Sequence, residues 1–327
     1  MSKNQFNDVE VKDLQKASDN HKDTMDRSVL ETMPDIQNGK YPASMSIQMV
    51  GIHGFKMPLL IARKDGGCME VVATVTGTVS LEADKKGINM SRILRRFYAK
   101  KNQISVFDMD KLIDVLKDYK KNVGAYDAHI DISFLYEMEQ DSLVSKDENG
   151  DPLRGYIFYP VVFDVNIDKH DNVSKVLKLD FAYSSACPCS TALSKHAALT
   201  EGLYGIPHSQ RSIARCELLI DLGKRLWIED LVEKLREILT TECQVIVKRE
   251  DEREFALRNG ADPKFVEDSI RRLGYCFENT PEIKDYKIIV SHNESLHHHN
   301  AIAVMLGGHS KYFTQDVSPE EYDALSR

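Results

Sequence analysis

The sequence lacks a long hydrophobic stretch and a pairing pattern of cysteines. No apolar run among its 327 residues approaches the ~20 residues that a membrane-spanning helix needs. The first residues are polar and do not form the apolar core of a signal peptide. The six cysteines show no disulfide-framework spacing and no CxxC pair of the kind that structural zinc sites use. These absences argue against a membrane protein and a disulfide-stapled secreted protein, and they predict a cytoplasmic protein with reduced thiols.

Basic residues are also fewer than acidic residues. The chain has 43 Lys and Arg against 51 Asp and Glu, which gives a net charge of −8. A general nucleic-acid groove is therefore not expected, although a local cluster of Arg and Lys could still bind an anionic small molecule. Hydrophobic residues at 42% are ordinary for a globular protein with a substantial core.

The chain divides into a polar tail and two halves with a similar order of elements. Residues 1–40 have no sustained periodicity and are expected to form a flexible tail. The segments 41–150 and 151–327 each follow a β-β-α-β-like order, which predicts an α+β fold dominated by antiparallel hairpins rather than a doubly wound sheet. Strands are expected over 45–50, 57–62, 71–79, 128–135, 156–168, 175–183, 214–221, 243–247, 286–290 and 301–306, and helices over 89–98, 109–119, 228–239 and 263–273.

Soft metal ligands gather in the second half of the sequence. Cys187 and Cys189 are two thiols one residue apart, and His208 follows in a polar run over 207–212. Carboxylates and further histidines occur over 248–252 and 294–299. Thiolate, imidazole and carboxylate together are the usual ligands of a catalytic metal that keeps a position open for water. The pattern therefore favours a metal-assisted enzyme.

With these motifs in order, the chain resembles the prokaryotic type IB GTP cyclohydrolases. The resemblance implies a bimodular tunnelling fold, in which each subunit holds two antiparallel-sheet-plus-helix modules. It also implies a homotetramer with active sites at the subunit interfaces. The implied reaction converts GTP and water to 7,8-dihydroneopterin triphosphate and formate, at the start of folate (tetrahydrofolate) biosynthesis. The matching motifs lie at 86–92, 187–190, 208–212, 248–252, 262–268 and 294–297.

The resemblance also implies the metal site. The ligands it indicates are Cys187, His208 and Glu252, with His297 as a fourth ligand or a proton donor. Such a mixed set accepts zinc, manganese or iron(II), and a bound metal lowers the pKa of its water so that hydroxide can attack C8 of guanine. Cys187 is expected to help protonate the imidazole ring of the purine. Shorter family members have a shorter gap than the 21 positions between Cys187 and His208, so a different loop path is expected here.

Four further residues are expected to bind GTP. A carboxylate at Glu294 could accept hydrogen bonds from guanine N1–H and the exocyclic amino group. Glu267 is a second site residue by resemblance, either binding substrate or orienting a ligand. Arg92 and Arg211 are the motif-linked cations for the triphosphate, since the planar guanidinium suits phosphate oxygens.

Two other functions compete with this interpretation. A tunnelling-fold nitrile reductase of queuosine synthesis would also bind a purine-like ring, but its cysteine would act as a covalent nucleophile without metal. A non-catalytic, metal-stabilised interaction module would hold its metal in a closed site and unfold when the metal is removed. Neither alternative accounts for all the motifs.

Overall fold

The computed structural model describes residues 32–34, 36–37, 39–40 and 45–326. The tail predicted over 1–40 falls largely outside these residues. Among the helices of the described part, none is long and apolar enough to cross a membrane.

A single antiparallel sheet forms the centre of the molecule. Its spatial order is the order of the sequence, so every strand pairs with its neighbour along the chain. This mixed, hairpin-based architecture confirms the predicted α+β class. The strands are β1 (Ile47–Ala62), β2 (Cys68–Leu81), β3 (Ala128–Lys146), β4 (Pro152–Ile167), β5 (Val173–Ala186), β6 (Ser209–Ile220), β7 (Ile283–His292) and β8 (Ala301–Gly308).

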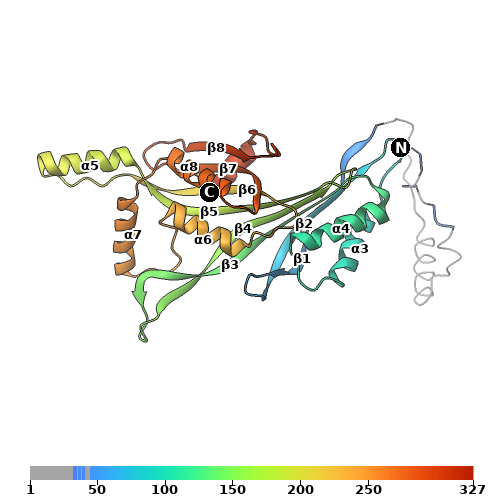
Figure 1. Cartoon of the computed structure of the whole chain (residues 1–327), viewed down its shortest axis with the longest axis horizontal. Coiled ribbons are helices and arrows are strands. Elements are labelled where there is room, and N and C mark those ends of the chain that lie inside the picture. The colour runs from blue at the N-terminus through green and yellow to red at the C-terminus, as the bar shows by residue number, and fades with distance from the viewer. Residues whose placement is uncertain (1–31, 35, 38, 41–44, 327) are drawn as a thin grey trace, which may run out of the picture.

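The helices are distributed over the two ends of this long sheet (Figure 1). The pair α3 and α4 packs on β1, β3 and β4, whereas α6 and α8 pack on β5, β7 and β8. Two further helices, α5 and α7, lie at the end of the molecule opposite to α3 (Figure 1). The helices are α3 (Met90–Lys101), α4 (Met109–Tyr119) with a π-helical turn η1 (Lys120–Gly124), α5 (Pro188–Glu201), α6 (Ile228–Leu239), α7 (Arg249–Ala261), α8 (Val266–Glu278) and α9 (Pro319–Leu325).

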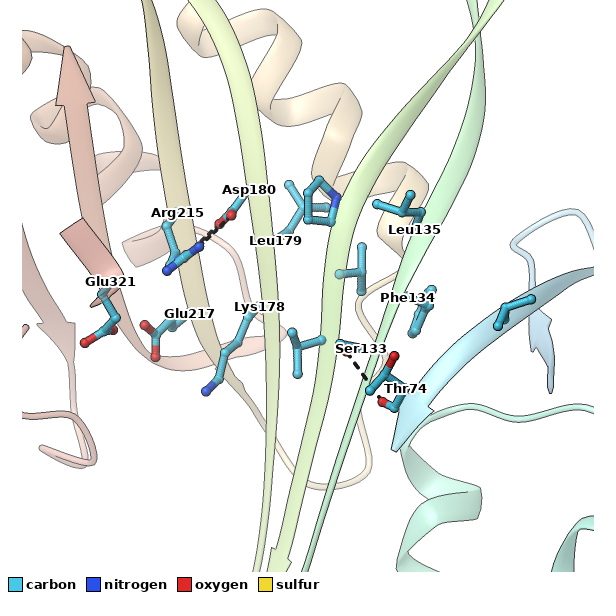
Figure 2. A pocket seen from close by; sticks show the side chains of 14 residues that line it. Thr74, Ser133, Phe134, Leu135, Lys178, Leu179, Asp180, Arg215, Glu217 and Glu321 are labelled. Atoms are coloured by element: carbon cyan, nitrogen blue, oxygen red, sulfur yellow. Dashed lines mark hydrogen bonds and ion pairs between the residues drawn. The ribbon is translucent and has the colours of Figure 1, made fainter. Parts of the chain in front are cut away.

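Alternation along the strands gives the sheet one apolar and one charged face. On β5, Leu177, Leu179 and Phe181 are buried in the core, while Lys178 and Asp180 point to the other side. The register of β5 and β6 pairs Lys178 with Glu217 and Asp180 with Arg215. Figure 2 shows these charged side chains on one face, with the Arg215 guanidinium bonded to Asp180 at 2.7 Å.

The chain end folds back onto the charged face. Ile289 pairs with Arg215 in the register and is fully buried, as is Leu325 of α9. Helix α9 contacts β6 and β7. Lys287 Nζ donates to the Asp316 carbonyl at 2.8 Å and lies 3.5 Å from Glu321. The C-terminal segment therefore covers part of a face that the other helices leave open.

The predicted strand over 243–247 is wrong, because these residues form an irregular connection between α6 and α7. Cys243 N–H donates to the Ala182 carbonyl of β5 at 3.3 Å, but no ladder follows, and a side chain of β3 satisfies two further backbone groups. The Gln140 carboxamide accepts from Val245 N–H at 2.9 Å and donates to the Cys243 carbonyl at 3.0 Å. The apolar residues of this segment thus reflect packing beside β3, not sheet formation.

Helices α5 and α7 were not predicted, and α8 begins later than expected. α7 is largely charged and has no apolar stripe, and α5 exposes large apolar side chains such as Leu193 and Leu199. Both therefore lack the one-sided periodicity that indicates a packed helix. α8 begins at Val266, three residues after Pro263.

The predicted module boundary after residue 150 falls in the turn that joins β3 to β4. The order of a hairpin, helices and a second hairpin occurs first over β1–β4 and again over β5–β8. The division into two modules stays a prediction.

Candidate functional site

Cys187 and His208 lie side by side although 21 positions separate them. The β5–β6 ladder ends at the pair Ala186 and Ser209, and just beyond it Cys187 N–H donates to the His208 carbonyl at 3.1 Å. Cys187 is also the N-cap residue of α5, with Pro188 in the first turn. The long gap is occupied by α5, which extends away from the sheet (Figure 1). The different loop path that was predicted between Cys187 and His208 is therefore a helix, and the two residues remain adjacent.

Glu294 meets His208 from the end of β7. His208 Nδ1 and Glu294 Oε2 are 3.5 Å apart, and neither atom has a hydrogen-bond partner although both are buried. A buried imidazole nitrogen and carboxylate oxygen without partners are unfavourable unless another group satisfies them. The two atoms therefore mark a place where a cation or a polar ligand group fits.

Glu252 and Glu267 stand in the first turns of α7 and α8, respectively, with exposed side chains. The start of α8 is tied to the site, because Lys264 N–H donates to the Ala186 carbonyl at 3.1 Å. Glu252 lies near the start of α7, where its neighbour Asp251 accepts a hydrogen bond from Ser145 N–H of β3. Within one chain, Glu252 is not brought to Cys187 and His208.

His297 lies in the connection between β7 and β8. β8 begins at Ala301, the strand start predicted from the sequence, so His297 precedes the strand. The rings of His297 and His299 stack with their centroids 4.9 Å apart, and both side chains are exposed. In the described residues these rings take part in no metal-binding group of three or more ligands.

The two predicted phosphate-binding arginines are far apart. Arg211 stands at the start of β6, exposed, and its carbonyl accepts from Asn293 N–H at 3.2 Å, next to Glu294. Arg92 lies on α3, at the opposite end of the molecule from α5 (Figure 1). One chain therefore places Arg211, but not Arg92, beside Cys187 and His208.

The residues fit a divalent transition metal only in part. A half-buried thiol at Cys187 and an unpartnered imidazole nitrogen at His208 are soft donors that suit such an ion. Across the described residues, however, no three His, Cys, Asp or Glu side chains converge as a metal-binding group. The predicted set of Cys187, His208, Glu252 and His297 is thus not assembled by one chain and stays a prediction.

The sequence analysis did not predict a buried polar layer next to these residues, which includes Tyr183, Ser185, Gln210, Lys264 and His292. His292 is only 2% exposed, and its Nε2 lies 2.9 Å from Tyr183 Oη. On the other side its Nδ1 lies 3.3 Å from Ser185 Oγ and 3.4 Å from Gln210 Nε2. Burial, aided by the nearby Lys264 cation, lowers the pKa of His292 to about 4. The imidazole is therefore neutral at physiological pH.

Lys264 is the most unusual member of this layer. Its side chain is fully buried, and Nζ forms no hydrogen bond, although Asp262 Oδ2 is 3.3 Å away. Burial lowers the pKa of Lys264, and Asp262 partly opposes that shift. Arg272 also binds both Asp262 oxygens at 2.9 Å. Lys264 lies within the motif over 262–268, but a sequence motif does not reveal that a lysine is buried.

The broad groove on the charged face of the sheet is separate from this site. It is lined by residues of β2 to β6 and by Glu321 (Figure 2). None of the residues predicted to bind metal or GTP contributes to it.

Comparison with known proteins identifies what the chain is similar to. The family model described as type I GTP cyclohydrolase folE2 matches residues 33–303. The chain is 40% identical over 308 residues to GTP cyclohydrolase FolE2 of Cereibacter sphaeroides, covering 92% of this chain and 82% of that protein. It is 42% identical over 290 residues to the FolE2 of Paracoccus denitrificans, covering 87% of each chain. Among solved structures, a hyper-thermostable uricase mutant matches with a TM-score of 0.50 and 8% identity, covering 83% of this chain and 94% of that one. This last likeness supports the tunnelling fold alone.

Proposed function

The chain belongs to the type I GTP cyclohydrolase folE2 family, and we propose that it converts GTP and water to 7,8-dihydroneopterin triphosphate and formate in folate biosynthesis. The observation that carries this proposal is the 40% identity to a curated GTP cyclohydrolase over 92% of the chain. The adjacency of Cys187 and His208 supports it, since these residues come from two of the motifs behind the predicted resemblance.

The proposal includes a divalent transition metal held by Cys187, His208 and Glu252, with His297 as fourth ligand or proton donor. Zinc, manganese and iron(II) all suit this mixture of sulfur, nitrogen and oxygen donors. When bound, such an ion lowers the pKa of a water molecule toward neutrality. Cys187, half-buried at the start of α5, would hold or deliver a proton at the same place.

The substrate contacts are proposed on the same strand ends. Glu294 would accept from the guanine N1–H and amino group, and Glu267, in the first turn of α8, would bind substrate or orient a ligand. Arg211 is exposed two residues after the Ser209 strand start and is free to bind phosphate oxygens. Arg92 would complete the triphosphate site, although it lies at the far end of its own chain.

We propose that a second copy supplies the missing side chains in a homotetramer. The support is geometric: Cys187 and His208 meet in one chain, whereas Arg92 lies at the opposite end and Glu252 does not converge with them. The cytoplasmic location predicted from the sequence likewise stays a prediction.

The first experiment tests the reaction itself. Metal-stripped protein is incubated with GTP, with and without added manganese, zinc or iron(II), and formate and oxidised pterin are measured. Both products should appear only after metal addition. Formate without pterin would mean that the ring opens without reclosing.

Absence of both products from a folded sample would reject the proposal and direct attention to the nitrile reductase alternative. Unfolding on metal removal, with no turnover under any condition, would instead support the non-catalytic module. A melting curve of the stripped protein separates these results.

Mixed oligomers test whether two copies share one site. The variants Arg92→Ala and Cys187→Ala should each be inactive alone, since each removes one part of every site. When they are co-expressed with different tags and purified as hetero-oligomers, activity should return, because some sites combine an intact Arg92 with an intact Cys187. No recovery in verified hetero-oligomers would mean that Arg92 does not act across an interface.

A further inference from the structure

Three candidate site residues each have a member of the buried polar layer two positions away in the sequence. Ser185 precedes Cys187, Gln210 follows His208, and the third such pair is His292 and Glu294. Ser185 and Gln210 are buried, as is His292. Each of the three strands therefore carries a buried polar residue near its end, and the site residue lies in the connection just beyond that end. None of these three buried residues has a role in the proposed reaction.

Hydrogen bonds join the three strand ends through His292. Gln210 Nε2 donates to Ser185 Oγ at 3.0 Å, which links β6 to β5, and both groups face His292 Nδ1 on β7. Ser185 Oγ is also 2.9 Å from Ser212 Oγ. His292 contacts side chains of β5, β6 and α8 together.

The opposite edge of the ring is fixed as well. Nε2 lies 2.9 Å from Tyr183 Oη and 3.5 Å from Ser269 Oγ of α8. A neutral imidazole offers one donor and one acceptor, which matches partners on both edges. Because burial and Lys264 keep the ring neutral, this pattern persists at physiological pH.

We propose that His292 is a positioning residue that holds the strand ends bearing Cys187, His208 and Glu294 at their working separations. This inference rests on the proposed function of those three residues. His292 touches neither substrate nor metal in this account, and it acts only through the backbone of β5, β6 and β7. Outer partners of metal ligands commonly change metal affinity or activity 10- to 100-fold when they are removed.

The test compares His292→Leu and His292→Gln with the wild-type protein. Metal affinity of the stripped protein is measured by zinc competition against a chromophoric chelator, and kcat and KM for GTP are measured separately. His292→Leu should weaken zinc binding and lower kcat by about 10- to 100-fold, with little change in KM. His292→Gln retains a donor and an acceptor and should recover part of both losses.

A matched control separates positioning from general destabilisation. Ile288 is fully buried on the same face of β7 as His292, but four residues farther from the strand end, where it pairs with Cys216. Ile288→Val should lower the melting temperature while zinc affinity and kcat remain those of the wild type. If His292→Leu does not fold, Tyr183→Phe removes the 2.9 Å contact to the ring and should shift zinc affinity in the same direction.

Unchanged zinc affinity and kcat in a folded His292→Leu would overturn the inference, as would losses that Ile288→Val reproduces at equal melting temperature. Zinc binding by the wild type without formate or pterin would reject the proposed reaction, while the affinity comparison would still decide the role of His292. A wild type that binds no zinc, manganese or iron(II) would overturn both.

Discussion

Single residues near the site owe their protonation behaviour to burial. The motifs at 187–190, 208–212 and 294–297 identify Cys187, His208 and Glu294 because their residue types carry the chemistry. The same motifs do not identify His292 or Lys264, since a sequence does not reveal that a histidine or a lysine is buried. Burial of a polar side chain depends on which elements pack over it, here α8 and the loop before it.

Acid should destabilise the protein through His292. The pKa is lowered from 6.5 to about 4 in the folded protein, so the unfolded chain binds a proton first as pH falls. The contribution is complete above pH 6.5 and is lost between there and pH 4, a change of about 3 kcal/mol. Urea unfolding of the metal-free protein at several pH values measures this.

The His292→Gln variant serves as the reference for that measurement, because glutamine does not titrate. Its free energy of unfolding should fall less than that of the wild type over the same pH range. Parallel curves for the two proteins would contradict the assignment.

At the scale of elements, α7 is held by its first turn rather than by an apolar face. Asp251 is fully buried and accepts from Val144 N–H at 2.8 Å, from Ser145 N–H at 3.0 Å and from Lys248 N–H at 2.8 Å. Burial opposes ionisation, but these bonds and the Ser145 hydroxyl more than offset it and lower the pKa of Asp251. The helix is therefore anchored to the end of β3 by one carboxylate.

Asp251→Asn should cost about 1.5–3 kcal/mol of stability, because an amide cannot replace a carboxylate that accepts from several donors. Glu250→Gln provides the control, since Glu250 is an exposed neighbour in the same turn. Urea unfolding should show a loss for the first variant and almost none for the second. Equal losses would mean that charge at the helix start, not the anchoring contact, stabilises α7.

Elements with one buried face were predictable, and those without one were not. Helix α6 has Leu231, Val232 and Leu235 buried at helical spacing, and its bounds agree with those predicted from the sequence. α7 depends on Asp251, which no periodicity marks. The misassigned segment 243–247 shows the converse, since apolar residues there pack without pairing in the sheet.

At the scale of the whole molecule, a fold dominated by antiparallel hairpins could be predicted from the sequence. The C-terminal segment that covers part of the charged face of the sheet could not. The C-terminal segment beyond β8 lies outside residues 33–303, which the family model matches. It is fixed by Leu325, by the ion pair of Lys287 with Glu321, and by Asp285, which accepts from Ser310 and Tyr312. These partners are far apart in the sequence, so no local pattern announces them.

Leu325→Ala should release this segment without unfolding the sheet. Truncating a fully buried leucine typically costs about 2–5 kcal/mol, more than a seven-residue helix can lose and remain attached. Limited trypsin digestion followed by mass spectrometry should then show rapid cleavage at Lys311. Exposed Leu296→Ala is the control, and cleavage at the wild-type rate in Leu325→Ala would show that α9 is held by its ion pairs instead.

The neighbour-by-neighbour strand order also bears on how the protein is made. Each strand finds its partner immediately before it in the chain, so every hairpin can close as soon as its second strand leaves the ribosome. The longest interval between the synthesis of two pairing strands falls between β6 and β7, because α6, α7 and α8 must emerge before β7 can pair with β6. We therefore expect the nascent chain to carry an exposed β6 edge during that interval, when premature association with another chain is most damaging.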